Sequence, residues 1–248
     1  MNQLRKLLVA NRGIGIFRAV ANGEEDTLYL YDVIVDDGDW GGVSAVAFTK
    51  ALMEMKAPTI HLRINSPGGD VFAARAMEQA IREHPSHIIA HIDGLAASAA
   101  SYVALAADQV LISAGGFFMI HKAMTMAFGN ADELLQIAGV LEKVDESLVN
   151  TYASATGQEP DQIRDWLAAE TWFNAEEALE FGFADVIAAA PEKTNTKSNA
   201  LTWDLSAYRH APQVAAVDLP TDEPDPARAA KQHTDHLMRQ LQVVRQAA

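Results

Sequence analysis

Three short motifs in this chain carry the residue types that acyl transfer needs. Ser98 stands among small residues, and His121 ends an apolar run. A serine hydroxyl becomes a useful nucleophile at neutral pH when a neighbouring base takes its proton, and a neutral imidazole is well suited to that task. We therefore expect Ser98 as nucleophile and His121 as base, provided that the fold brings the two side chains together.

A glycine pair supplies the third requirement of this chemistry. Attack on a carbonyl places negative charge on its oxygen, which fixed backbone N–H groups stabilise. Gly68 and Gly69 follow an apolar run, and glycine lets the backbone approach closely because it has no Cβ. The N–H of Ala99 is the expected second donor. A helix over residues 96–107 would place Ser98 in its first turn, where unpaired N–H groups favour negative charge.

The elements around these motifs alternate between strands and helices. Apolar runs and helical periodicity predict strands at 27–35, 59–64, 87–92 and 109–112, and helices at 43–55, 70–83 and 96–107. This alternation indicates crossover connections and a mostly parallel sheet with helices on its faces, which is an α/β fold. The loops at the carboxyl ends of such strands gather in one place, and the motif residues all follow such runs.

Four segments in order resemble a known family. They are INSPGGDVF (64–72), DGLAASAAS (93–101), MIHKA (119–123) and ETWFNAEEALEFGFAD (170–185). Together they resemble the ClpP family of serine peptidases, the proteolytic subunits of the Clp protease, and most closely its phage-encoded members that act as head maturation proteases. The resemblance covers residues 25–190. It implies a ClpP/crotonase-like fold of repeated ββα-type units.

The resemblance also implies roles for single residues. The nucleophile falls on Ser98, the base on His121, and the oxyanion donors on Ala99 and Gly69, with Gly68 as the less favoured alternative. The third triad position, usually an aspartate in the family, falls on Glu170. Triads with either acid occur. Asp165 is the reserve candidate, and a solvated charge or a helix cap is the alternative role of Glu170.

The amino-acid composition excludes or disfavours several classes of function. The 248 residues are 49% hydrophobic and carry a formal charge of −14, which disfavours binding to nucleic acid. There is no cysteine, so thiol catalysis and disulfides are excluded. The apolar run near Met1 is too short for a signal peptide and no stretch is long enough for a membrane span, so we expect a cytoplasmic protein, in a bacterial host if it is phage encoded.

The sequence implies no cofactor and no metal. Acidic residues at 36–39 lack a fuller ligand set, and the other histidines are irregularly spaced.

The chain divides into four expected regions: an N-terminal arm (1–24), a ClpP-like serine protease domain (25–190), a Pro-rich linker (191–224) and a C-terminal amphipathic helix (225–248). The final helix needs a partner surface, by self-association or on a capsid or scaffold component, or else it is a loose tail. Residues 132–156 resemble the family's handle helix, through which rings of subunits meet; an ordinary core helix is the alternative.

We expect a homo-oligomeric ring that acts on polypeptide substrates. No motif in the N-terminal arm indicates an ATPase unfoldase as a partner.

Other functions stay open. A degradative Clp-type subunit would use the same site. A crotonase-type acyl-CoA enzyme would use backbone oxyanion donors without needing Ser98 or His121. A non-catalytic assembly protein would need neither. A Ser-Lys dyad is less favoured because no lysine lies between Ala57 and His121, although Lys122 is adjacent to the base.

Overall fold

The computed structural model describes residues 3–11, 13–36, 41–189, 200–201, 203–212 and 217–218. The chain divides into two compact units, the first being Met1–Thr194 with Leu201–Val217 and the second Asn195–Ala200 with Asp218–Ala248. The first unit contains nearly all of the described residues. The C-terminal helix expected at 225–248 and most of the linker expected at 191–224 lie outside the described residues.

A mixed sheet forms the centre of the first unit. Its strands follow the order β1-β2-β5-β6-β7-β10, and β8 pairs with both β6 and β9. Neighbours from β2 to β10 are parallel, whereas β1 is antiparallel to β2 and β9 is antiparallel to β8. The strands are β1 (Ile16–Ala21), β2 (Glu25–Tyr31), β3 (Ile34–Val35), β4 (Val43–Ser44), β5 (Thr59–Ser66), β6 (His87–Ala97), β7 (Gln109–Ser113), β8 (Phe117–Ile120), β9 (Thr171–Phe173), β10 (Val186–Ala188), β11 (Ala200–Leu201) and β12 (Val217–Asp218).

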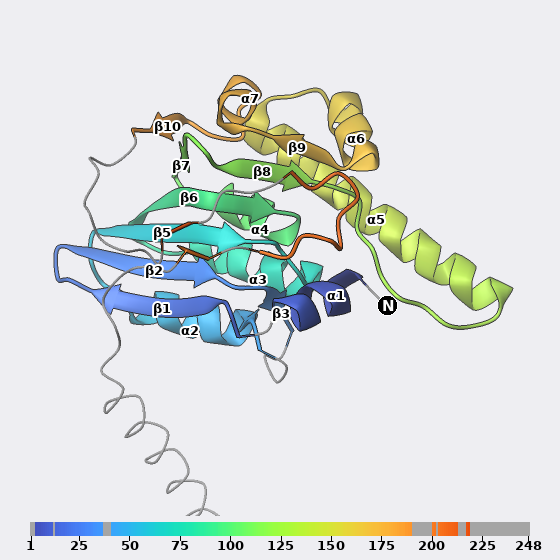
Figure 1. The fold of residues 1–248 in the computed structure, drawn as a ribbon, viewed down its shortest axis with the longest axis horizontal. Helices are drawn as coiled ribbons and strands as arrows, with labels where there is room; N and C mark the ends of the chain where they lie inside the picture. Colours follow the sequence, from blue (N-terminus) through green and yellow to red (C-terminus); the bar gives the residue numbers. More distant parts are fainter. Residues whose placement is uncertain are drawn as a thin grey trace, which may run out of the picture. The chain divides into compact units, whose positions relative to one another are not determined.

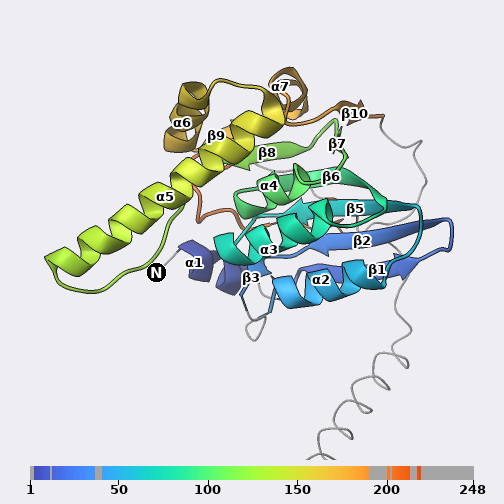
Figure 2. The same cartoon turned by 180° about the vertical axis from the view of Figure 1, so that it is seen from behind.

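Helices connect the parallel strands. Helices α2, α3 and α4 lie on one face of the sheet, as Figure 2 shows, while α5 extends beyond the sheet edge (Figures 1 and 2). The helices are α1 (Gln3–Ala10), α2 (Ala45–Glu54), α3 (Val71–Arg82), α4 (Ala99–Ala104), α5 (Ala131–Thr156), α6 (Pro160–Ala169) and α7 (Ala175–Glu180). The expected α/β class with a mostly parallel sheet is confirmed.

Strand β5 illustrates how the sequence builds this core. Ile60, Leu62 and Ile64 are fully buried, whereas His61 and Arg63 between them are partly exposed. Successive side chains of a strand point to opposite faces, so the apolar set faces the helices and the polar set faces away. The strand ends in the glycine turn, which therefore sits at the carboxyl edge of the sheet.

Two regions differ from the sequence-based expectation. The stretch 1–24, expected as an arm, contains α1 and β1, and β1 pairs with β2 along its whole length because Ile16–Ala21 suits an edge strand. Residues 203–212, expected as part of a linker, belong to the first unit. Three large apolar side chains of this segment are buried there: Trp203, Leu205 and Tyr208 are each at most 7% exposed. Burial of such side chains offsets the cost of ordering the segment.

Candidate active site

Ser98 and His121 meet because β6 and β8 run side by side. Ala97, the last residue of β6, pairs with Met119 in parallel register, and the Ser98 N–H donates to the Met119 carbonyl at 2.8 Å. His121 follows β8 directly. This register brings the Oγ of Ser98 to 2.7 Å from the Nε2 of His121, within hydrogen-bond distance. The two residues singled out from the sequence are thus in direct contact.

Ser98 occupies the junction between strand and helix. Its φ is 52°, a left-handed conformation that is uncommon for a residue other than glycine. Helix α4 begins at Ala99, so the expectation that Ser98 lies in the first turn of a helix over 96–107 is wrong: pairing with β8 keeps the chain extended through Ala97. The sharp turn presents the hydroxyl at the end of β6.

The glycine turn approaches the same serine. Gly68 has a φ of +87°, and a Cβ there would lie 2.4 Å from the Ala97 carbonyl oxygen and 2.8 Å from the Ser98 Cβ. Gly69 has a φ of +151°, and its Cβ would collide with the Ile34 carbonyl at 1.9 Å. Only glycine fits either position.

The two glycines differ in their N–H groups. Gly68 donates its N–H to the Ser66 hydroxyl at 3.2 Å, so that group is engaged within the turn. Gly69 and Ala99 line the same small cavity as Ser98 and His121. The N–H of Gly68 is thus occupied, and Gly69 and Ala99 remain the candidates for oxyanion donors.

The imidazole of His121 is held in its neutral form. Burial lowers the pKa of His121 to about 4, and the charge of Glu170 raises it in part. At neutral pH the ring is therefore uncharged and able to accept a proton from Ser98.

The expected acids lie in different surroundings. Glu170 ends α6 with a φ of 54° and is near enough to His121 to influence its charge. Among the described residues, however, no hydrogen bond joins it to the imidazole: its Oε1 accepts the backbone N–H groups of Arg209 and His210 at 2.7 and 2.8 Å. Asp165 lies exposed on α6 and makes no hydrogen bond to His121.

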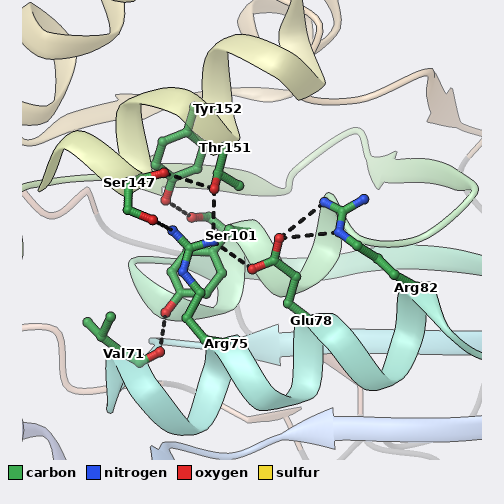
Figure 3. A network of polar contacts seen from close by, with 9 residues as sticks. Val71, Arg75, Glu78, Arg82, Ser101, Ser147, Thr151 and Tyr152 are labelled. Atoms are coloured by element: carbon green, nitrogen blue, oxygen red, sulfur yellow. Dashed lines mark hydrogen bonds and ion pairs between the residues drawn. The ribbon is translucent and has the colours of Figure 1, made fainter. Parts of the chain in front are cut away.

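A polar network fixes α4 between α3 and α5 (Figure 3). The Ser101 hydroxyl bonds to both the Ser98 carbonyl and the Tyr152 hydroxyl, the latter at 2.6 Å. Arg75 on α3 donates to Glu78 on its own helix and to Ser147 and Thr151 on α5. A network of connected hydrogen bonds of this kind restricts the packing of the elements it joins.

Residues 203–212, hereafter the strap, complete the surroundings of the site. The Tyr208 ring packs edge-on against His121 and Trp172, with centroid separations of 5.5 and 5.7 Å, and its hydroxyl donates to the Pro67 carbonyl. Sequence reasoning missed Tyr208. The available signal was the pair of aromatic residues Trp203 and Tyr208 within a stretch whose composition suggests a linker.

The cavity that remains next to Ser98 has a volume of about 50 Å³. Its walls include Leu7, Val71, Tyr102 and Tyr208. A cavity needs about 10–15 Å³ to hold one water molecule, so this space is large enough for water next to Ser98.

Neither a metal site nor a membrane span is present in the described part of the chain. No three His, Asp or Glu residues cluster there in a way that could hold a metal ion. None of the helices in that part is long and apolar enough to cross a bilayer.

Comparison with solved structures supports the fold. The chain superposes on a ClpP1 variant from Listeria monocytogenes with a TM-score of 0.58 and 23% identity, over 66% of this chain and 92% of the other.

Sequence comparisons identify the family. The chain is 31% identical to the ATP-dependent Clp protease proteolytic subunit 1 of Protochlamydia amoebophila over 160 residues, which is 62% of this chain and 78% of that protein. It is 27% identical to the proteolytic subunit of Leuconostoc citreum over 197 residues, or 74% and 98% of the two chains. The Clp protease family model matches residues 43–191. This chain is therefore a member of the Clp protease family.

Proposed function

We propose that this chain is a serine endopeptidase in which Ser98 is the nucleophile and His121 the general base. The observation that carries the proposal is the 2.7 Å contact between the Ser98 Oγ and the His121 Nε2, at an imidazole kept neutral by burial. A hydroxyl paired with a neutral imidazole beside glycine-rich backbone is the arrangement that acyl transfer requires.

The reaction follows from these positions. Nε2 of His121 takes the Ser98 proton as Oγ bonds to the carbonyl carbon of the peptide, and the oxyanion is held by the N–H groups of Gly69 and Ala99. The protonated His121 then gives its proton to the leaving amine, and the C–N bond breaks to leave an acyl-Ser98 ester. Water, deprotonated by His121, hydrolyses the ester and restores the free hydroxyl.

Glu170 is the proposed third member of the triad. Its charge already stabilises protonated His121, since it acts to raise the pKa of that imidazole. A carboxylate in this role orients the ring and stabilises the cation that forms during catalysis. Asp165 is the weaker candidate because its side chain is exposed on α6.

The working form is proposed to be a homo-oligomeric ring. Large apolar side chains are exposed on and just before α5: Met126, Phe128 and Leu135 are 51%, 84% and 71% exposed. A cluster of this kind favours contact with another protein surface. Relatives named as proteolytic subunits are consistent with an assembly of subunits.

Two biological roles fit such a peptidase. The names of the relatives favour a degradative subunit supplied by an ATPase. The strap, which lies beyond the family match at 43–191, favours instead a processing enzyme such as a phage head maturation protease, because limited cleavage of capsid or scaffold proteins benefits from a site that is closed until needed. Both roles place the protein in a bacterial cytoplasm.

The test is hydrolysis of an unfolded polypeptide by the purified full-length protein and its Ser98→Ala variant. We expect cleavage by the wild type and none by the variant, with the same oligomeric mass for both. Equal cleavage by the two proteins would contradict the assignment. Hydration of an enoyl-CoA that survives Ser98→Ala would favour the crotonase-type alternative.

A further inference from the structure

We propose that the strap is an autoinhibitory segment, which closes the peptide site and engages Glu170 until it is displaced. This inference rests on the proposed function and concerns its regulation. Four observations support it: the position of Tyr208 beside His121, the hydrogen bonds between Glu170 and the strap, the small cavity next to Ser98, and the contacts that attach the strap.

Tyr208 lies directly beside the candidate catalytic pair. Its hydroxyl donates to the Pro67 carbonyl, two residues before the proposed oxyanion donor Gly69, and its ring packs edge-on against His121. Burial raises the pKa of Tyr208, and its side chain lines the same small cavity as Ser98 and His121. In the proposed closed state this side chain hinders the approach of a peptide carbonyl to Ser98.

The strap also engages the proposed third triad residue. Oε1 of Glu170 accepts the N–H groups of Arg209 and His210, both from the strap backbone. Hydrogen bonds to a carboxylate are stronger than those between neutral groups. The strap therefore occupies Oε1 of the carboxylate whose charge acts on His121.

The space beside the nucleophile is narrow. Tyr208 forms one wall of the 50 Å³ cavity next to Ser98. Pockets that take drug-sized ligands measure about 300–1,000 Å³. Displacing Tyr208 would widen the cavity at the point where the proposed reaction takes place.

The strap is attached by contacts that can be replaced. Its three apolar anchors are buried, and Asn11 pairs with the backbone of Asp204 through two hydrogen bonds of 2.7 and 3.0 Å. Trp203 donates to Oδ1 of buried Asn65, but Nδ2 of the same amide has no partner among the described residues.

The experiment measures the rate at which a fluorophosphonate labels Ser98 in the full-length chain. Arg209→Pro removes one N–H that binds Glu170, whereas Arg209→Ala keeps that N–H and changes only an exposed side chain. We expect labelling about tenfold faster in Arg209→Pro than in wild type, because the competent fraction increases, and no change in Arg209→Ala. Tyr208→Ala, which removes the obstruction itself, is the second variant and should also be faster.

Amide hydrogen exchange gives an independent readout. Labelling of Ser98 in the wild type must displace Tyr208, so the amides of Arg209 and His210 should exchange faster in the labelled protein than in the unlabelled one. Unchanged exchange there would overturn the proposal.

The outcomes separate this inference from the proposed function. Equal labelling of Ser98 in wild type, Arg209→Ala, Arg209→Pro and Tyr208→Ala would overturn the autoinhibitory strap and leave the serine peptidase standing. No labelling of Ser98 in any of the four proteins would overturn the peptidase, and the strap inference with it.

Discussion

The two sides of the candidate site are built in different ways. On one side, Ser98 and His121 extend from paired parallel strands, and their 2.7 Å contact follows from backbone register. On the other side, Glu170 faces His121 but binds the backbone of the strap, a segment outside the family match. In the proposed account the first side is preformed, because Ser98 and His121 are already in contact, whereas the carboxylate on the second side is engaged by the strap.

The contacts that hold the two sides of the site in place differ as well. Ser98 is backed by Ser101, Tyr152 and the Arg75 network, which join α4 to two long helices (Figure 3). The strap is held by three apolar anchors and a few hydrogen bonds to side chains and to one carbonyl. Elements joined by many contacts resist local opening, and a short segment held by fewer contacts opens more readily.

The largest expected effect is on the preformed side. His121→Gln should slow fluorophosphonate labelling of Ser98 by about 10²- to 10⁴-fold, because general-base assistance is lost. The control is His91→Gln, which removes an imidazole bonded to His61 in the sheet and should label as the wild type does. Rapid labelling in His121→Gln would mean that another group activates Ser98.

The next prediction concerns peptide hydrolysis and tests whether Glu170 acts as a triad member once the strap is released. In the Arg209→Pro background, Glu170→Ala should lower peptide hydrolysis by about a hundredfold, because His121 loses its orienting charge. In the wild-type background the loss should be smaller, since removing the carboxylate also loosens the strap. A double-mutant cycle measures this difference, and the same loss in both backgrounds would show that strap and carboxylate are not coupled.

A smaller effect concerns the glycine turn. Gly68→Ala should lower the free energy of unfolding by about 2 kcal/mol, because the φ of +87° is strained for alanine and the new Cβ meets the Ala97 carbonyl. Labelling should slow as well, since Ser98 must shift. The matched control is Gly115→Ala, where a Cβ meets nothing within 4 Å, and urea denaturation compares the two. Equal stability of both variants would argue against the close approach.

The buried imidazole predicts a pH effect on stability. Since folding lowers the pKa of His121 from 6.5 to about 4, the unfolded chain binds a proton in this range and the folded chain does not. This residue therefore costs no stability above pH 6.5 and destabilises the fold progressively as the pH falls towards 4. By pH 5 the loss is about 2 kcal/mol.

His121→Gln should therefore gain stability relative to the wild type between pH 7 and pH 5. Urea midpoints at the two pH values measure the gain. A constant difference between the proteins would indicate that the ring is solvated in the folded state.

The smallest effect concerns the support of α4. Tyr152→Phe removes the hydroxyl bonded to Ser101 and should cost about 1 kcal/mol, measured by urea denaturation. Tyr29→Phe is the control, because among the described residues its hydroxyl makes no hydrogen bond and its ring contacts are kept. A change below the error of the measurement would mean that the network adds nothing to stability.

The preformed side could be predicted from sequence because short stretches of sequence determine the strands that position Ser98 and His121. Alternating strands and helices indicated a parallel sheet, and both Ser98 and His121 follow apolar runs. Parallel strands end at a shared edge, which brings such residues together. Two helix ends also follow from local sequence: Gly157 closes α5 in a left-handed conformation, and Pro160 opens α6.

The other side could not be predicted because it depends on contacts distant in sequence. Tyr208 meets His121 and Pro67 across long separations, and Pro-rich, polar surroundings mask its apolar anchors. The start of α4 was misplaced for a related reason: alanines favour helix, but pairing of β6 with β8 overrides that preference through Ala97.

The most direct test of Ser98 as the nucleophile is to locate the fluorophosphonate adduct by mass spectrometry of the intact full-length chain and of its peptides. We predict one adduct per chain, on the peptide that contains Ser98, and none in Ser98→Ala. An adduct on another residue, or labelling that persists in Ser98→Ala, would contradict that assignment.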